Sequence, residues 1–227
     1  GADALRWYLV ASPVLRGLDL KLDEKAIADV VRGVVLPFWN AYSFFCLYAN
    51  TDRYEAKLRS DAPGLLDRYI LAKTHELVTA VTERLDAYDL GGACSQVFGF
   101  LDALTNWYIR RSRERFWRSG MDDDKRDAYD TLYTALVTFA KTVAPLLPFV
   151  SEEVYRGLTR EDSVHLANWP DAATLPADAK LVAEMDRVRG AASAARTLRE
   201  KVGVRVRQPL AEMTIAGPGV ASLARYE

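Results

Sequence analysis

Hydrophobic residues recur at intervals of three and four positions over most of the chain, which is the spacing of one face of an α-helix. This pattern predicts four long helices, over residues 22–49, 65–87, 94–118 and 125–146. Each has a single apolar stripe, and short breaks join one helix to the next. Helices of this kind bury their stripes against one another, so we expect a mainly α protein built around an antiparallel helix bundle.

Proline and glycine mark boundaries within this pattern. Pro37 lies inside the first long helix and lacks an amide hydrogen, so we expect a kink near Leu36. Gly91 and Gly92 predict the break before the third helix. A short fifth helix is expected over residues 151–156.

The pattern changes near the end of the chain. A last long helix is predicted from Pro176 to Lys201, and Gly203 follows it. Residues 204–210 (VRVRQPL) alternate in polarity, which predicts a strand with its arginines on one face, and residues 213–215 suggest a second strand. We therefore expect a short β segment after the last helix.

Composition fits an ordinary soluble globular protein, because 50% of the 227 residues are hydrophobic and 27% are charged. The net charge of −1 argues at first against nucleic-acid binding, but the positive charge is concentrated. Residues 106–118 hold five arginines and one glutamate, and residues 187–207 hold seven Lys or Arg and one glutamate. All other residues together are strongly acidic. Two local basic surfaces are therefore predicted.

Residues 106–117 (NWYIRRSRERFW) interleave aromatic rings with arginines. A guanidinium pairs with phosphate or stacks on a base, and a ring accepts an unstacked base, so this run favours RNA binding. Arg111, Arg115 and Arg118 continue the apolar stripe of the same helix. They are expected to face either an anionic ligand or carboxylates of a neighbouring helix. The acidic residues 122–124 offer such carboxylates, and they also suit the N-terminal cap of the next helix.

The second basic segment lies at the end of the last helix and in the predicted strand. Basic side chains near a helix C-terminus complement its dipole, so part of this charge needs no ligand. The cations considered for binding there are Arg196, Arg199, Lys201, Arg205 and Arg207.

Enzyme chemistry has little support in these residues. His75 and His165 have no nearby cysteine or carboxylate pattern and are expected to be structural, and no glycine-rich phosphate-binding loop is present. Cys46 and Cys94 are expected to be buried, reduced thiols. We predict no catalytic site and no metal site. We also see no signal peptide and no apolar run of about 18 residues, so a cytoplasmic protein that binds no membrane is expected.

Four motifs carry a resemblance to a known family. They are GADALRWYL at 1–9, NWYIRRSR at 106–113, PLLPFVSEE at 145–153 with SVHL and WP shortly after it, and KVGVRVRQPL at 201–210. In this order, and over essentially the whole chain, they resemble the class I aminoacyl-tRNA synthetases for branched aliphatic amino acids. Within that family the arginine run resembles the isoleucine-specific members most.

The resemblance implies a division of the chain. Residues 1–21 would connect to a catalytic domain outside this sequence, 22–160 would form the helical anticodon-binding bundle, and 161–175 would be a crossing segment. Residues 176–227 would be a helix and the start of a small mixed junction domain. The family's two ATP-binding signatures have no match, so ATP with magnesium is implied only for the catalytic domain and no cofactor for this chain.

The resemblance also implies a partner, the anticodon stem and loop of isoleucine tRNA, bound as part of a monomeric ATP-dependent ligase. Asn40 and Phe44 match the family pattern Asn-x-x-x-Phe, whereas Ser43 replaces an arginine of some relatives. Substituting Trp107 or Arg111 by alanine is expected to weaken tRNA binding with little change in stability. The expected tRNA-binding residues are Asn40, Phe44, Asn106, Trp107, Arg110, Arg111, Arg113, Arg115, Trp117, Arg196, Arg199, Lys201, Arg205 and Arg207.

Two alternatives remain open. The chain could be the corresponding domain of the valine or leucine enzyme, which comparison of the matching tRNAs would separate. It could also be a helical protein-interaction module whose arginine face docks an acidic partner. The alternation of rings and guanidinium groups is not needed for a plain acidic surface, so it favours RNA.

Overall fold

The computed structural model describes residues 1–20, 22–217 and 219–226, so Lys21, at the expected domain boundary, and Pro218 lie outside it. The chain forms two compact units, Gly1–Ala177 and Asp178–Glu227. The described residues are mainly helical and contain no strand. The predicted mainly α architecture is therefore confirmed, whereas the predicted β segment is not observed.

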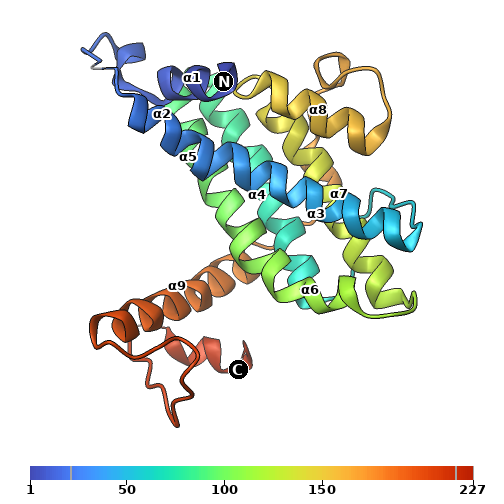
Figure 1. The fold of residues 1–227 in the computed structure, drawn as a ribbon, viewed down its shortest axis with the longest axis vertical. Coiled ribbons are helices and arrows are strands. Elements are labelled where there is room, and N and C mark those ends of the chain that lie inside the picture. The colour runs from blue at the N-terminus through green and yellow to red at the C-terminus, as the bar shows by residue number, and fades with distance from the viewer. Residues whose placement is uncertain (21, 218, 227) are drawn as a thin grey trace. The chain divides into compact units, whose positions relative to one another are not determined.

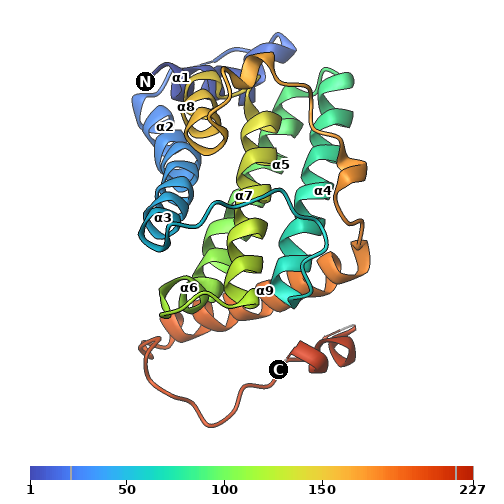
Figure 2. The ribbon, with the colours of Figure 1, turned by 90° about the vertical axis from the view of Figure 1, so that its right-hand side faces the viewer.

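Three long helices form the centre of unit 1, which is a helix bundle (Figure 1 and Figure 2). They are α4 (Leu65–Asp86), α5 (Leu90–Asp102) and α7 (Asp123–Val143), and α4 contacts both of the others. Their shared core is apolar and aromatic and includes the fully buried side chains of Tyr69, Ile70, Phe100, Leu132 and Phe139. Burial of these stripes is the main force that holds the bundle together.

Helix α1 (Ala2–Ala11) packs at one end of this bundle, beside α8 (Pro148–Thr159). The Asp3 carboxylate accepts hydrogen bonds from the amides of Phe149 (3.2 Å) and Val150 (2.7 Å), which caps the first turn of α8. The Arg6 guanidinium donates to the carbonyl oxygen of Pro145 at 2.7 and 3.0 Å. The first residues of the chain are thus built into unit 1. A 3-10 turn, Pro13–Arg16, follows α1.

The first predicted long helix consists of α2 (Glu24–Val30), a π-helical turn (Val31–Val35) and α3 (Leu36–Asp52). Pro37 is the second residue of α3, and the π turn directly before it lies where the kink was predicted.

By length and composition alone, Glu24–Asp52 could cross a membrane, contrary to the expectation that no apolar run is long enough. One side of α3 is packed on α7, because the Phe38 ring contacts Phe139 (centroids 4.7 Å apart) and the Phe45 ring contacts Tyr129 (6.2 Å).

The third predicted helix is also continuous but begins earlier than expected. Helix α5 starts at Leu90, and the Asp89 carboxylate caps it by accepting a hydrogen bond from the Gly92 amide (3.0 Å). Gly91 and Gly92 therefore lie in its first turn and form no break. A π-helical segment, Ala103–Ile109, connects α5 to α6 (Arg110–Trp117).

Two 3-10 turns, Val164–Leu166 and Ala172–Thr174, lie in the predicted crossing segment. Unit 2 begins with α9 (Ala179–Lys201), which is capped by Asp178, so Pro176 precedes the helix. A 3-10 helix, Val220–Tyr226, ends the described part of unit 2.

The segment predicted as strands, 204–215, has irregular backbone. The Arg199 guanidinium donates to the carbonyl oxygens of Arg205 (3.2 Å), Val206 (3.0 Å) and Gln208 (2.9 Å). A strand needs a neighbouring strand for these groups, and here one side chain satisfies three of them. The alternating pattern alone therefore did not produce a sheet.

Candidate nucleic-acid interface

Helix α6 and the π-helical segment before it carry the run of aromatic and arginine residues. Tyr108, Ser112 and Phe116, spaced four apart, are fully buried against the bundle. A different line of side chains is exposed, again at helical spacing. We call this line the outer stripe, and it consists of Asn106, Arg110, Arg113 and Trp117.

The outer stripe holds the cations best placed to meet a ligand. Arg110 and Arg113 are exposed and make no hydrogen bond or ion pair with another residue in the described part of the chain. Trp117 is 57% exposed, which is high for an indole in a folded protein. The Asn106 amide donates to the Asp102 carboxylate (2.7 Å) and remains exposed. Two free guanidinium groups and an open ring thus share one face.

Trp107 and Arg111 have different surroundings from those expected. The Trp107 ring is only 7% exposed, and the Arg111 guanidinium carbon lies 3.9 Å from the ring centroid. This is a cation–π contact that covers the ring. Burial of Trp107 does not agree with the expectation that alanine there leaves stability almost unchanged.

Arg115 and Arg118 face carboxylates, which was one of the two alternatives. Arg115 forms a two-pronged pair with the fully buried Asp67, with both N–O distances 2.8 Å, and a third contact to Asp124 at 2.9 Å. Arg118 pairs with Asp122 (2.5 Å) and Asp124 (2.8 Å). Both guanidinium groups are thus paired with carboxylates of the protein, which leaves the outer stripe to meet a ligand.

These contacts also change the pKa of one group. Burial acts to lower the pKa of the Arg115 guanidinium, but its hydrogen bonds and charge interactions with Asp67 raise that pKa above its ordinary value. The Asp122 carboxylate accepts a hydrogen bond from the Lys125 amide (2.8 Å), so the predicted cap of α7 is confirmed.

Lys125 is a structural residue that the sequence did not reveal, because it lies in the polar first turn of α7. It is 1% exposed, and its Nζ lies 2.6 Å from the Asp52 carboxylate and donates to the Arg118 carbonyl oxygen (2.8 Å). The Tyr129 hydroxyl also donates to Asp52 (2.5 Å). Burial acts to raise the pKa of Asp52, but these hydrogen bonds outweigh it and hold the pKa below its ordinary value. The C-terminal ends of α3 and α6 are thus fixed to α7.

Helix α3 joins the candidate surface through Phe44. The Phe44 ring is half-buried and contacts Phe116 of α6 (centroids 5.1 Å apart) and Tyr48 (4.9 Å). Asn40, one turn earlier on α3, is exposed, as is Ser43. Phe44 therefore acts as packing between α3 and α6, while Asn40 is open to solvent.

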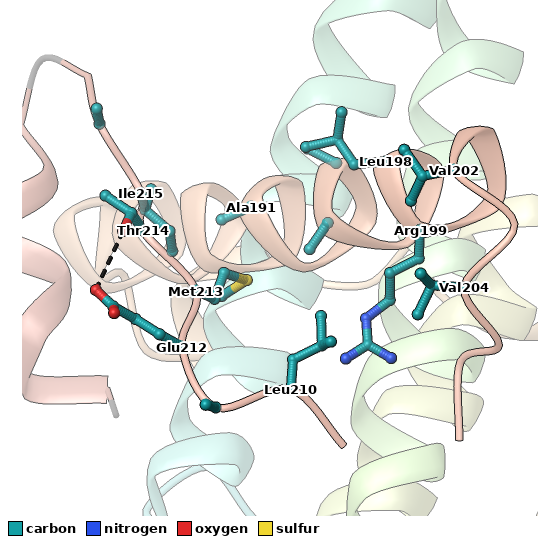
Figure 3. Close-up of a pocket in the computed structure, with 14 residues that line it drawn as sticks. Ala191, Leu198, Arg199, Val202, Val204, Leu210, Glu212, Met213, Thr214 and Ile215 are labelled. Atoms are coloured by element: carbon teal, nitrogen blue, oxygen red, sulfur yellow. Dashed lines mark hydrogen bonds between the residues drawn. The ribbon is translucent and has the colours of Figure 1, made fainter. Parts of the chain in front are cut away.

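Unit 2 carries the second basic cluster. Arg199 is occupied by the three backbone carbonyls described above, whereas four other candidates are exposed: Arg196, Lys201, Arg205 and Arg207. A groove of about 640 Å³ lies between α9 and the segment after it. Figure 3 shows Leu198 and Val202 on one side of this groove and Leu210 and Met213 on the other. The groove is mainly apolar, and the free cations lie outside its lining.

The histidines and cysteines form no chemical centre in the described residues. One ring nitrogen of His165 lies 3.1 Å from the Pro148 carbonyl oxygen, and His75 is half-buried in α4. Both cysteines are free thiols; Cys94 is buried, which raises its pKa to about 12, and Cys46 is half-buried. No group of three or more metal-binding side chains lies together within the described ranges.

Comparison with known families identifies this arrangement. Residues 67–215 match the model of a family described as the anticodon-binding domain of tRNA ligase. The chain belongs to this anticodon-binding domain family. The match includes the outer stripe, the Asp67–Arg115 pair and the second basic cluster. The resemblance inferred from the four sequence motifs is therefore confirmed.

Similar proteins are isoleucine–tRNA ligases. The chain is 52% identical to the isoleucine–tRNA ligase of Leifsonia xyli subsp. xyli over 229 aligned residues, covering 100% of this chain and 20% of that protein. It is 50% identical to the isoleucine–tRNA ligase of Mycobacterium tuberculosis H37Rv over 216 residues, covering 95% of the chain and 20% of that protein. The chain thus spans about a fifth of the length of these relatives.

The fold of the anticodon-binding domain is also found in a solved structure. The ternary complex of Agrobacterium radiobacter K84 agnB2 LeuRS with tRNA and LeuAMS superposes on this chain with a TM-score of 0.55. The match covers 80% of this chain and 20% of that chain, at 16% sequence identity. At that identity the likeness shows a shared fold.

Proposed function

We propose that this anticodon-binding domain holds the anticodon arm of isoleucine tRNA as part of an isoleucine–tRNA ligase. The observation that carries the proposal is the outer stripe, which presents two unpaired arginines and an exposed tryptophan on one face of α6. The choice of isoleucine tRNA is supported by identities of about 50% to isoleucine–tRNA ligases along the chain.

The chemistry of the outer stripe suits a nucleic-acid loop. Bases of a single-stranded loop are already partly unstacked, so an exposed indole can accept one without opening a duplex. Guanidinium groups at positions 110 and 113 can pair with backbone phosphates on either side of such a base. The proposed contacts in unit 1 are Asn40, Asn106, Arg110, Arg113 and Trp117, and those in unit 2 are Arg196, Lys201, Arg205 and Arg207.

The rest of the ligase reaction is assigned to the remainder of the longer protein, in the cytoplasm. ATP with magnesium would supply the energy that activates the amino acid there. The described residues do not fit ATP with magnesium, since they contain no glycine-rich phosphate loop and no cluster of metal-binding side chains. No step of amino-acid activation is therefore assigned to them.

Titration of isoleucine tRNA with the 227-residue chain at several salt concentrations tests the proposal. Arg110→Gln and Arg113→Gln are each expected to weaken binding and to reduce the slope of log affinity against log salt by roughly 0.7 to 0.9 per lost phosphate contact. Arg156→Gln removes an exposed arginine of α8 and serves as the matched control.

Three results would contradict the proposal. They are absence of binding, a salt slope near zero, and a loss of affinity in Arg156→Gln equal to that in Arg110→Gln. Valine and leucine tRNAs, titrated in parallel, test the assignment to isoleucine tRNA. Equal affinity for the isoleucine, valine and leucine tRNAs would contradict that assignment. An acidic protein partner bound in preference to tRNA would favour an interaction module instead.

A further inference from the structure

Asp67 lies in the first turn of α4 and is 0% exposed, yet it is a carboxylate with three donors around it. Its Oδ1 accepts hydrogen bonds from the Tyr108 hydroxyl and from Arg115 Nη1, both at 2.8 Å. Its Oδ2 accepts from Arg115 Nη2, also at 2.8 Å. A buried carboxylate is thus fully occupied by two residues of the chain segment that carries the outer stripe.

The two residues that donate to Asp67 lie on either side of the free arginines in the sequence. Tyr108, in the π-helical segment, precedes Arg110, and Arg115, in α6, follows Arg113. Arg115 Nη2 also donates to the Asp124 carbonyl oxygen (2.8 Å), which fixes the end of this stretch to the start of α7. Both ends of the short segment that presents Arg110 and Arg113 are therefore tied down on its buried side.

The other polar ties described above, from Arg118 to Asp122 and Asp124 and from Lys125 to the Arg118 carbonyl oxygen, lie beyond the C-terminal end of α6. Between Tyr108 and Arg115, the buried Ser112 Oγ has no hydrogen-bond partner in the described part of the chain, and neither does Trp107 Nε1 just before it. The remaining buried side chains, such as Phe116, are apolar, and apolar packing tolerates small rotations and shifts. A two-pronged guanidinium–carboxylate pair is strongly directional, although it adds little net stability when buried.

We propose that Asp67, through Tyr108 and Arg115, positions Arg110 and Arg113 for the RNA backbone. This inference rests on the proposed function and deepens it. Asp67 and Arg115 are positioning residues and make no contact with RNA themselves, because the Arg115 side chain is only 16% exposed and its Nη atoms are already occupied. The segment behaves as a rigid unit, so its buried ties set the direction of its exposed face.

The direction in which Asp67→Asn changes tRNA affinity distinguishes a positioning role from a purely electrostatic one. Asp67→Asn removes a negative charge close to the RNA-binding face, so electrostatics alone would strengthen tRNA binding. Positioning requires the opposite, namely a loss of affinity of about threefold to tenfold, in the usual range for coupled neighbours. Tyr108→Phe removes only the hydroxyl and is expected to lose affinity in the same direction but by less. It keeps the test valid if Asp67→Asn is poorly folded.

A double-mutant cycle then shows through which residues Asp67 acts. In a chain that already carries Arg110→Gln and Arg113→Gln, Asp67→Asn and Tyr108→Phe should cause no further loss of affinity for isoleucine tRNA. Full additivity would mean that the effect does not pass through these arginines and would overturn the inference. Arg115→Lys keeps the charge and loses the two-pronged geometry, so it should weaken binding as well. Circular dichroism and thermal unfolding of each variant check that the fold is retained.

The outcomes distinguish this inference from the function on which it rests. Absence of binding by the unchanged chain, or no effect of the Arg110→Gln, Arg113→Gln pair, refutes the proposed function and the inference together. Binding that depends on both arginines but is unchanged or tighter in Asp67→Asn and Tyr108→Phe overturns the positioning role alone. Weaker tRNA binding by Asp67→Asn and by Tyr108→Phe, with no added loss of affinity in the chain that carries Arg110→Gln and Arg113→Gln, supports the positioning role.

Discussion

Two tryptophans ten residues apart in one helical run have opposite roles. Trp107 is buried beneath Arg111, whereas Trp117 is 57% exposed at the end of α6. Their order in the sequence does not indicate which is which, because both follow the same interleaved pattern. Burial assigns Trp107 to the core and Trp117 to the surface.

The two residues should therefore respond differently to alanine. Trp117→Ala is expected to weaken tRNA binding by about 1–3 kcal/mol, the contribution of one stacked base, with little loss of stability. Trp107→Ala is expected to cost about 3–5 kcal/mol of unfolding free energy, because it leaves a large cavity. Urea denaturation and tRNA titration of both variants measure these effects. A Trp107→Ala protein as stable as its parent would contradict the core assignment.

The Asp52–Lys125 pair makes part of the stability depend on pH. The pKa of Asp52 is lower in the folded protein than its ordinary value of 3.8. Its contribution is therefore present above that value and is lost as the pH falls through the folded pKa. We expect the stability difference between the parent and Asp52→Asn to shrink from roughly pH 5 to pH 2.

Urea denaturation of both proteins across that range measures the change, with the exposed Asp162→Asn as the baseline. A difference that stays constant, or grows as the pH falls, would show that Asp52 is not stabilised as an anion in the fold.

One of the two alternatives drawn from the sequence for Arg115 and Arg118 holds, because the partners lay nearby. Residues 122–124 were recognised as possible partners for Arg115 and Arg118, and two of those carboxylates do pair with them. Asp67 could not be found, since it is 48 residues from Arg115 and joins it only after α4 and α6 pack together. Contacts of this kind depend on tertiary structure, which local spacing does not encode.

At the scale of elements, α3 and α8 approach closely at one glycine. A Cβ added at Gly157 of α8 would overlap the Tyr42 Oη and lie 2.8 Å from the Tyr42 Cζ. Gly157→Ala is therefore expected to cost about 1–3 kcal/mol through overpacking, more than the gain from better helix propensity. Gly99→Ala on α5 is the matched control, because an added Cβ there meets nothing within 4 Å.

Thermal unfolding of the two glycine variants checks this expectation. Gly99→Ala should stabilise the protein by about 0.5–1 kcal/mol, as alanine does in an exposed helix position. Equal stabilisation by Gly157→Ala would show that the two helices can move apart at no cost.

The helices were predictable because their stripes are long and regular. A π turn, Val31–Val35, lies next to the position where Pro37 predicted a kink. The strands predicted over 204–215 are absent from the structure. Alternation over a few residues does not supply a neighbouring strand, and here the Arg199 side chain donates hydrogen bonds to three of the carbonyl groups.

At the scale of the whole molecule, the protection of backbone amides from hydrogen exchange should be very uneven. We expect the slowest amide hydrogen exchange in α4, α5 and α7, whose side chains form the core of unit 1. Residues 204–216 should exchange quickly, because they lack a backbone hydrogen-bond ladder. Hydrogen–deuterium exchange with mass spectrometry resolves both regions. Strong protection over 204–216 would instead indicate paired strands.

Net charge was the least informative whole-molecule property. A value of −1 conceals two basic segments, and the structure reduces the effective charge further by pairing Arg115 and Arg118 internally. Family membership was predictable because four motifs occur in a fixed order, which composition alone cannot show.

The π-helical segment Ala103–Ile109 also determines which way α6 faces. An α-helix turns by about 100° per residue, and a π turn takes up one extra residue within a single widened turn. If this segment became regular α-helix at the same chain length, α6 would turn about its own axis by about that angle, and Phe116 would move toward solvent. Loss of the π turn can absorb a deletion of one residue within 103–106, whereas an inserted residue would turn α6. Insertions in this segment should therefore be far less tolerated than single deletions.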